Sequence, residues 1–112
     1  MRPYFTDDEI EGLAPALVER LSAARKLAMV PFVITSGYRS PERNAAVGGG
    51  DNSAHLRGFA VDLSAHDSVS RFKIVKALFD AGFTRIVLYA SDGHIHVDCD
   101  DTLPQGVLVV KP

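Results

Sequence analysis

Short segments of alternating side chains constrain the fold of this 112-residue chain more than any other feature. In residues 58–64, large apolar side chains fall at every second position, and small or polar ones, including Asp62, fall between them. Side chains on a strand point alternately to opposite faces, so this pattern predicts a strand with a buried face and a face that carries Asp62. Three further strand candidates follow, with a Ser-Asp-Gly turn between the first two: residues 85–89, 94–98 and 106–110.

Two longer segments carry apolar residues at the three- and four-residue spacing of an amphipathic helix. The first spans about residues 7–27 and opens with a capping box formed by Thr6 and Glu9. Pro15 interrupts it, and because an interior proline removes a backbone hydrogen bond, the segment could form two shorter helices. The second helix is expected over residues 68–81, where Gly82 ends it.

The region between these helices is expected to hold a β-prone run at residues 32–35 and a short helix at residues 41–45, with Ser40 as its cap. Short turns between strands indicate an antiparallel sheet, and the helices must pack against it. The sequence therefore predicts an α+β fold with a small antiparallel sheet and helices on one side. We expect one domain over residues 1–112, because this length suits a single hydrophobic core.

Composition excludes several classes of function. The chain has 12 basic and 14 acidic residues and no basic stripe, so nucleic acid is not an expected partner. The single cysteine, Cys99, excludes both an intrachain disulfide and a cysteine-based zinc site. No apolar stretch approaches the ~20 residues of a membrane helix, so we expect no membrane span. We expect a monomer.

The strongest functional signal is a group of metal-binding side chains. It has two parts, about thirty residues apart: Ser53-x-His55-x-x-Gly58-x-Ala60-x-Asp62 and His94-x-His96. Residues two apart on a strand point to the same side, so His94 and His96 share a face and can meet Asp62 if their strands are neighbours. Two histidines and a carboxylate can hold one divalent metal and leave a position open. A further histidine can move protons, so the residues alone predict a metallohydrolase.

Each part also has an ordinary structural explanation. A His-x-His pair alone is more often a solvated strand face, and His66, at an expected helix start, is assigned to the surface. Asp98 shares the face of the paired histidines and could orient one imidazole, but solvation at a strand end is the interpretation that we favour. Cys99 is interpreted as a small apolar residue. The combined pattern is what favours a metal site.

These motifs resemble the peptidase M15 family, which contains zinc D-Ala-D-Ala carboxypeptidases, peptidoglycan endopeptidases and small phage endolysins. The resemblance covers more than half of the chain and is carried, in the order of the family, by Ser36-Gly37-Tyr38-Arg39-Ser40-Pro41, Asn44, Val47-Gly48-Gly49, residues 53–62 and His94-Ile95-His96. It implies a single M15-like metallopeptidase domain over residues 1–112, with the hedgehog/DD-peptidase type of α+β fold. In this fold the sheet carries the zinc site.

The resemblance also implies a role for each residue of the motifs. One zinc ion per chain would be held by His55, Asp62 and His96. Arg39 would stabilise the oxyanion or grip a substrate carboxylate. Many relatives have a glutamate three residues before the last ligand, but Gly93 stands there, so His94 is expected to be the general base or proton shuttle. Ser53 and Tyr38 are expected to bind substrate or support the site, although Tyr38 could equally be packing.

The implied function is zinc-dependent hydrolysis of stem or cross-link peptides in bacterial peptidoglycan, by a D-Ala-D-Ala carboxypeptidase or an endopeptidase, such as a phage lysis enzyme. That choice depends on whether the cleft is closed at one end. The N-terminal sequence lacks a secretory signal, so we expect cytoplasmic synthesis and action at the cell wall after release or export by a partner. Two alternatives are a non-catalytic zinc-containing module, which binds peptidoglycan or builds a phage structure, and hydrolysis of another small amide.

Overall fold

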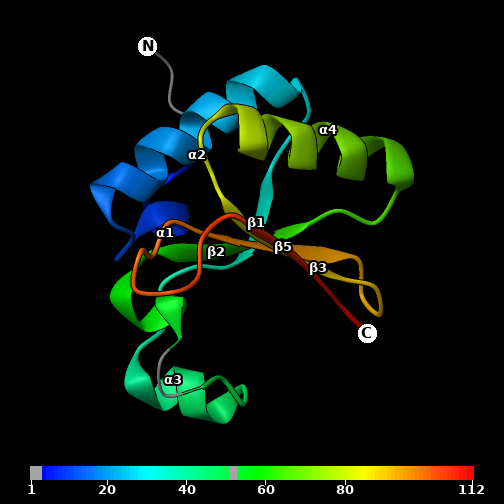
Figure 1. Cartoon of the computed structure of the whole chain (residues 1–112). Coiled ribbons are helices and arrows are strands. Elements are labelled where there is room, and N and C mark those ends of the chain that lie inside the picture. The colour runs from blue at the N-terminus through cyan, green and yellow to red at the C-terminus, as the bar shows by residue number, and fades with distance from the viewer. Residues whose placement is uncertain (1–3, 51–52) are drawn as a thin grey trace.

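A five-stranded sheet forms the centre of the computed structural model, which describes residues 4–50 and 53–112 (Figure 1). The strands lie in the order β1-β2-β4-β3-β5. Their bounds are β1 Val33–Ser36, β2 Ala60–Ser64, β3 Arg85–Tyr89, β4 His94–Asp98 and β5 Val107–Lys111. The first four strands pair in antiparallel fashion, as predicted, but β5 runs parallel to β3. The sheet is therefore mixed, because residues 99–106 carry the chain past the start of β3, and β5 then begins beside Arg85 and runs in the same direction as β3.

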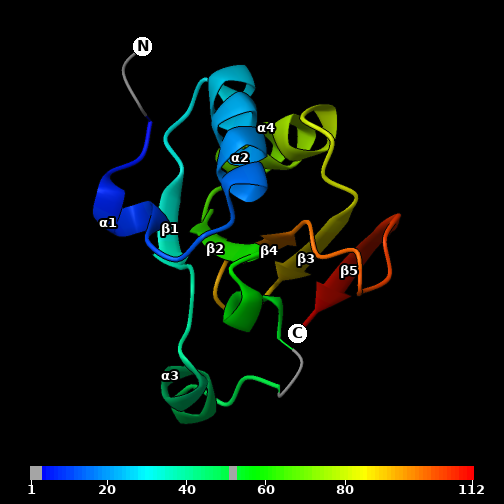
Figure 2. The ribbon, with the colours of Figure 1, turned by 90° about the vertical axis from the view of Figure 1, so that its left-hand side faces the viewer.

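Two long helices, α2 (Pro15–Ala28) and α4 (Ser68–Asp80), cover one face of the sheet (Figures 1 and 2). The short helix α3 (Pro41–Ala46) and the 3₁₀ helix η1 (Ala54–Arg57) lie on the other side of the sheet. The segment predicted as helical over residues 7–27 forms two helices, α1 (Asp7–Ile10) and α2, which is the alternative that Pro15 suggested. Pro15 is the first residue of α2, where its missing N–H costs no hydrogen bond.

The hydrophobic core lies between the sheet and the two long helices. Alternation along the strands turns Val61 and Leu63 of β2, and Ile95 and Val97 of β4, into this core, where all four are fully buried. The residues between them face the opposite side of the sheet. The same alternation that builds the core therefore leaves the predicted site residues on the face that the long helices do not cover.

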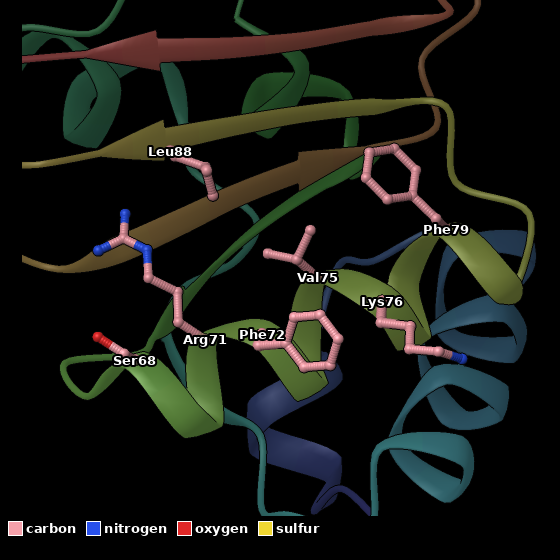
Figure 3. Close-up of a pocket in the computed structure, with 7 residues that line it drawn as sticks. All are labelled: Ser68, Arg71, Phe72, Val75, Lys76, Phe79 and Leu88. Atoms are coloured by element: carbon pink, nitrogen blue, oxygen red, sulfur yellow. The ribbon is translucent and has the colours of Figure 1, made fainter.

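Helix α4 buries only part of its apolar surface. Its buried residues are Ile74, Ala77 and Leu78, whereas Phe72 is 70% exposed and Phe79 is 42% exposed. The exposed side chains border an apolar groove of about 440 Å³ between α4 and Leu88 of β3, the residues of which are shown in Figure 3. Within the described ranges, no helix is both long and apolar enough to span a membrane.

Candidate metal centre

The pairing of β2 with β4 brings two of the predicted ligands side by side. Asp62 is directly opposite His96 in the register, and Ser64 is opposite His94. The two strands were predicted from their alternation, but their pairing could not be read from the sequence. The register therefore shows that the strands of Asp62 and His96 are neighbours, which the sequence analysis could only assume.

The third predicted ligand, His55, is delivered by η1, which immediately precedes β2. The Ser53 hydroxyl caps η1 by accepting a hydrogen bond from the His55 N–H (3.3 Å), and it does not reach Asp62. Gly58 ends η1 with a φ of +74°, and a Cβ at this position would lie 2.3 Å from the Gly12 carbonyl oxygen. The glycine in the motif is thus required for both the turn and the close packing of the chain.

Side-chain atoms of His55, Asp62 and His96 lie within 4.8 Å of one another. One Asp62 oxygen is 3.4 Å from His55 Nε2 and 3.1 Å from His96 Nδ1. His55 Nδ1 donates to the Gly37 carbonyl (2.8 Å), which can only accept, so Nε2 is the ring nitrogen that faces the group. This donor set suits zinc or a similar divalent metal. The role of the three residues as ligands stays a prediction.

The charges of the three groups support one another. Burial opposes ionisation of Asp62, but hydrogen bonds and positive charge from His55 and His96 outweigh it and hold the pKa of Asp62 well below its ordinary range. Burial likewise disfavours charged His96, but hydrogen bonds to Asp62 and Asp98 outweigh it and raise the pKa of His96 above the ordinary histidine value. The centre is therefore an ionised carboxylate between two imidazoles, a set of groups that can bind a divalent cation.

Asp98 is not the solvated strand-end residue that we favoured from the sequence. It is fully buried, its carboxylate oxygen lies 2.8 Å from His96 Nε2, and the same oxygen accepts from Arg85 Nε (3.0 Å). Residues 99–106 fold over this end of β4, which the sequence could not show. Asp98 therefore orients the His96 ring so that Nδ1 faces Asp62. Cys99 packs against the core, as expected for a small apolar residue.

Arg39 lies next to the three candidate ligands. Its guanidinium group approaches Asp62 Oδ2 (3.4 Å) and donates to Asn44 Oδ1 (3.2 Å) and to Ser36 Oγ (3.2 Å). Buried Asn44 in turn donates to the Gly50 carbonyl (2.9 Å) and so fixes the neighbouring glycine loop. These contacts hold the guanidinium group at the edge of the site, where it can meet a substrate oxygen.

His94 is held by two neighbours that the sequence analysis did not single out. Its ring stacks on Tyr89 with the ring centroids 4.2 Å apart, and its Nδ1 is hydrogen-bonded to the Asp92 carboxylate. The second ring nitrogen, Nε2, is left for other partners. Tyr89 belongs to a predicted strand and Asp92 to a predicted turn, but no sequence signal connected either residue with His94.

A cleft of about 440 Å³ joins the three candidate ligands to Arg39, Ser53 and His94. Beside it lies a second hollow of about 350 Å³, and the two share Gly50, Ser53, Tyr89, His96 and Lys111. We call the two together the trough. Tyr38 is absent from the lining of both hollows, and its ring lies against Gly12 instead. His66 is also absent from both linings.

Comparisons with known proteins agree with this arrangement. The chain is 38% identical over 64 residues to the zinc D-Ala-D-Ala carboxypeptidase of Streptomyces albus G. That match covers 57% of this chain but only 25% of the relative. The fold is similar to that of the L-Ala D-Glu endopeptidase ChiX of Serratia marcescens, with a TM-score of 0.63 and 22% identity over 86% of this chain and 87% of that one. The family model described as Peptidase M15 matches residues 5–98, and the chain therefore belongs to the Peptidase M15 family.

Proposed function

We propose that this protein is a zinc-dependent endopeptidase that hydrolyses bonds within the stem or cross-link peptides of bacterial peptidoglycan. Membership of the Peptidase M15 family supports peptide hydrolysis. The peptidoglycan substrate and the zinc ion are suggested by the names of the relative and of the fold neighbour. The observation that carries the choice of endopeptidase is the trough, which continues on both sides of His96.

One zinc ion per chain would be held by the three side chains that converge in the centre, His55, Asp62 and His96. These three donors leave a fourth position of a tetrahedral site open. When bound, zinc lowers the pKa of a water molecule to about 7 and polarises a carbonyl group. The chain itself contributes the orientation of the imidazoles, through the Gly37 carbonyl and Asp98.

The proton transfers are assigned to His94. Its Nδ1 is occupied by Asp92, so Nε2 takes a proton from the attacking water and later delivers it to the leaving amine. The Asp92 carboxylate and the Tyr89 ring hold the imidazole in place during both steps. The guanidinium group of Arg39, fixed by Asn44, donates hydrogen bonds to the carbonyl oxygen as negative charge develops on it.

An endopeptidase must accept a chain that continues beyond both residues of the scissile bond. The first hollow extends toward Arg39 and Val47, and the second extends toward Arg85 and Leu103. A carboxypeptidase instead needs a cleft that is closed behind the terminal carboxylate. The continuous trough therefore favours cleavage inside a peptide over removal of its last residue.

The test is mass spectrometry of purified peptidoglycan and its soluble fragments after incubation with the zinc-loaded protein. Cleaved stem or cross-link peptides are expected from the wild type and not from His94→Ala. Release of free D-alanine alone would show a carboxypeptidase and would contradict the endopeptidase assignment. Zinc binding without either product would favour a non-catalytic module.

A peptidoglycan substrate also implies where the protein acts. We propose that it works at the cell wall, which it reaches after release from the cytoplasm or through export by a partner, as a phage lysis enzyme does. Fractionation of producing cells before and after lysis tests this proposal. Wall degradation that requires lysis or a co-expressed membrane-permeabilising partner would support it, and degradation without either would overturn it.

A further inference from the structure

We propose that Lys111 binds a carboxylate that the substrate carries beside the scissile bond, so that the protein prefers this substrate to its amidated form. This inference rests on the proposed peptidase function and adds a determinant of specificity to it. The family match ends at residue 98, whereas Lys111 lies on β5. The proposed contact is therefore a property of this chain outside the matched motifs.

The register of the parallel pair places Lys111 close to the reaction centre. Lys111 of β5 is opposite Tyr89 of β3, and its ammonium nitrogen lies 5.9 Å from the centre of the Tyr89 ring. That ring stacks on His94. Lys111 also lines both hollows of the trough, at the part that they share. A cation at this point meets the substrate close to the bond that is cleaved.

The backbone of Lys111 is anchored although its side chain is exposed. The Ala90 N–H donates to the Lys111 carbonyl (3.0 Å), and the Ser91 hydroxyl donates to the Pro112 carbonyl (3.3 Å). The end of β5 is therefore tied to the turn that follows Tyr89. The ammonium group can adjust to a ligand without loosening the strand.

Lys111 differs from the two arginines of the trough because no carboxylate of the described residues pairs with its charge. Arg39 faces the Asp62 carboxylate and Arg85 faces the Asp98 carboxylate. In the part of the chain that the structure describes, Lys111 has no carboxylate within ion-pair distance. It is thus the trough cation whose charge is available to a ligand, and a substrate carboxylate is the complementary group.

Peptides that contain D-glutamate linked through its side chain carry such a carboxylate. Their α-carboxyl group stays free next to the peptide bond, and conversion to the primary amide removes the charge with almost no change in shape. This pair of ligands isolates the interaction with Lys111. An ion pair with an exposed lysine predicts a preference for the acid peptide of about two- to five-fold.

The experiment compares L-Ala-γ-D-Glu-L-Lys amide with its D-isoglutamine counterpart, using zinc-loaded wild type, Lys111→Met and Lys73→Met. Lys73 lies on α4, on the other side of the sheet, and serves as the matched control. We expect the wild type and Lys73→Met to show a higher kcat/KM for the acid peptide. Lys111→Met should lose this preference, with its kcat/KM for the acid peptide reduced to about that for the amide peptide.

An equal loss on both peptides in Lys111→Met, or a preference that survives the substitution, would overturn the role of Lys111 while hydrolysis itself still supports the peptidase. If the wild type cleaves neither peptide, hydrolysis of this bond is excluded, and the uncleaved peptides become ligands for isothermal titration calorimetry. A binding of the acid peptide alone that is about two- to five-fold weaker in Lys111→Met would then support the inference. Equal binding, or none, would overturn it.

Discussion

Two hollows of the same volume, about 440 Å³ each, lie on opposite faces of the sheet, yet only one has the chemistry of an active site. Adjacent residues of β3 line the two hollows: Leu88 lines the α4 groove (Figure 3), and Tyr89 lines the trough. The groove is lined mainly by apolar side chains. In the trough, two histidines and a carboxylate converge. The size of a hollow therefore does not identify the site in this molecule, whereas the convergence of fixed polar groups does.

The buried polar groups of the trough are held in place because each has a partner. Among the described residues, no buried side-chain nitrogen or oxygen lacks a hydrogen bond. Arg39, His55 and His96 each have a second contact that orients the group toward the centre. The groove offers apolar surface without such orientation. An apolar hollow often suits a ligand, but catalysis requires donors and acceptors whose positions are already fixed.

The largest effect is expected from Asp62→Asn in the trough. The substitution removes the charge that joins both imidazoles, so zinc affinity and kcat should fall by more than the 10- to 100-fold typical of residues that only support a ligand. Chelator competition and peptidoglycan hydrolysis measure both quantities. Phe72→Ala in the groove is the control and should change neither by more than about two-fold. Strong loss in Phe72→Ala with little in Asp62→Asn would reverse the two assignments.

Among substitutions on the trough side of the sheet, Gly58→Ala is expected to lower the free energy of unfolding most. The positive φ alone costs about 1–3 kcal/mol for a residue with a Cβ, and the contact with the Gly12 oxygen adds to this. We expect about 3 kcal/mol or more in urea unfolding. Gly82→Ala, after α4, also has a positive φ but meets no atom within 4 Å, so its cost should be only about 1 kcal/mol. Equal losses in the two variants would show that the close packing at Gly58 is unimportant.

Asp98→Asn tests whether the buried carboxylate orients a ligand. Zinc affinity should fall by about 10- to 100-fold, because the amide holds the His96 ring less firmly than the charged group does. The readouts are chelator competition and the visible absorption of the cobalt-substituted protein. Asp80→Asn removes an exposed ion pair with Lys76 on α4 and should leave both unchanged. An unaltered cobalt spectrum in Asp98→Asn would contradict the proposed orientation of His96.

The sequence predicted the individual helices and strands on both sides of the sheet, but it did not predict which strands pair or in what register. Alternation predicted β2 and β4 and the face of Asp62, and the family resemblance predicted the candidate ligands. Neither source contained the register that sets Asp62 opposite His96, because strand pairing is a long-range property. The parallel course of β5 was missed for the same reason, and with it the burial of Asp98 and the approach of Lys111 to Tyr89.

Helical spacing also predicted α4 but could not show how much of its apolar stripe the neighbouring elements cover. Spacing identifies an apolar stripe, whereas the neighbouring elements decide how much of it is covered. Helix α2 and the sheet cover Ile74 and Leu78, and they leave Phe72 and Phe79 at the border of the groove (Figure 3). Periodicity alone therefore could not separate a buried face from an exposed groove.

The smallest effect is expected at the exposed cap of α4. Hydrogen bonds from Ser70 favour ionised Asp67 and lower its pKa. A carboxyl group with a lowered folded-state pKa stabilises the fold above its unfolded-state pKa of about 3.9, and this contribution is lost as pH falls through the folded-state value. Asp67→Asn keeps a cap but cannot titrate, so urea midpoints measured from pH 6 to pH 3 should fall less steeply than those of the wild type. Because α4 lies on the side of the sheet away from the trough, hydrolysis at neutral pH should not change, and a loss of activity there would mean that the two faces are coupled.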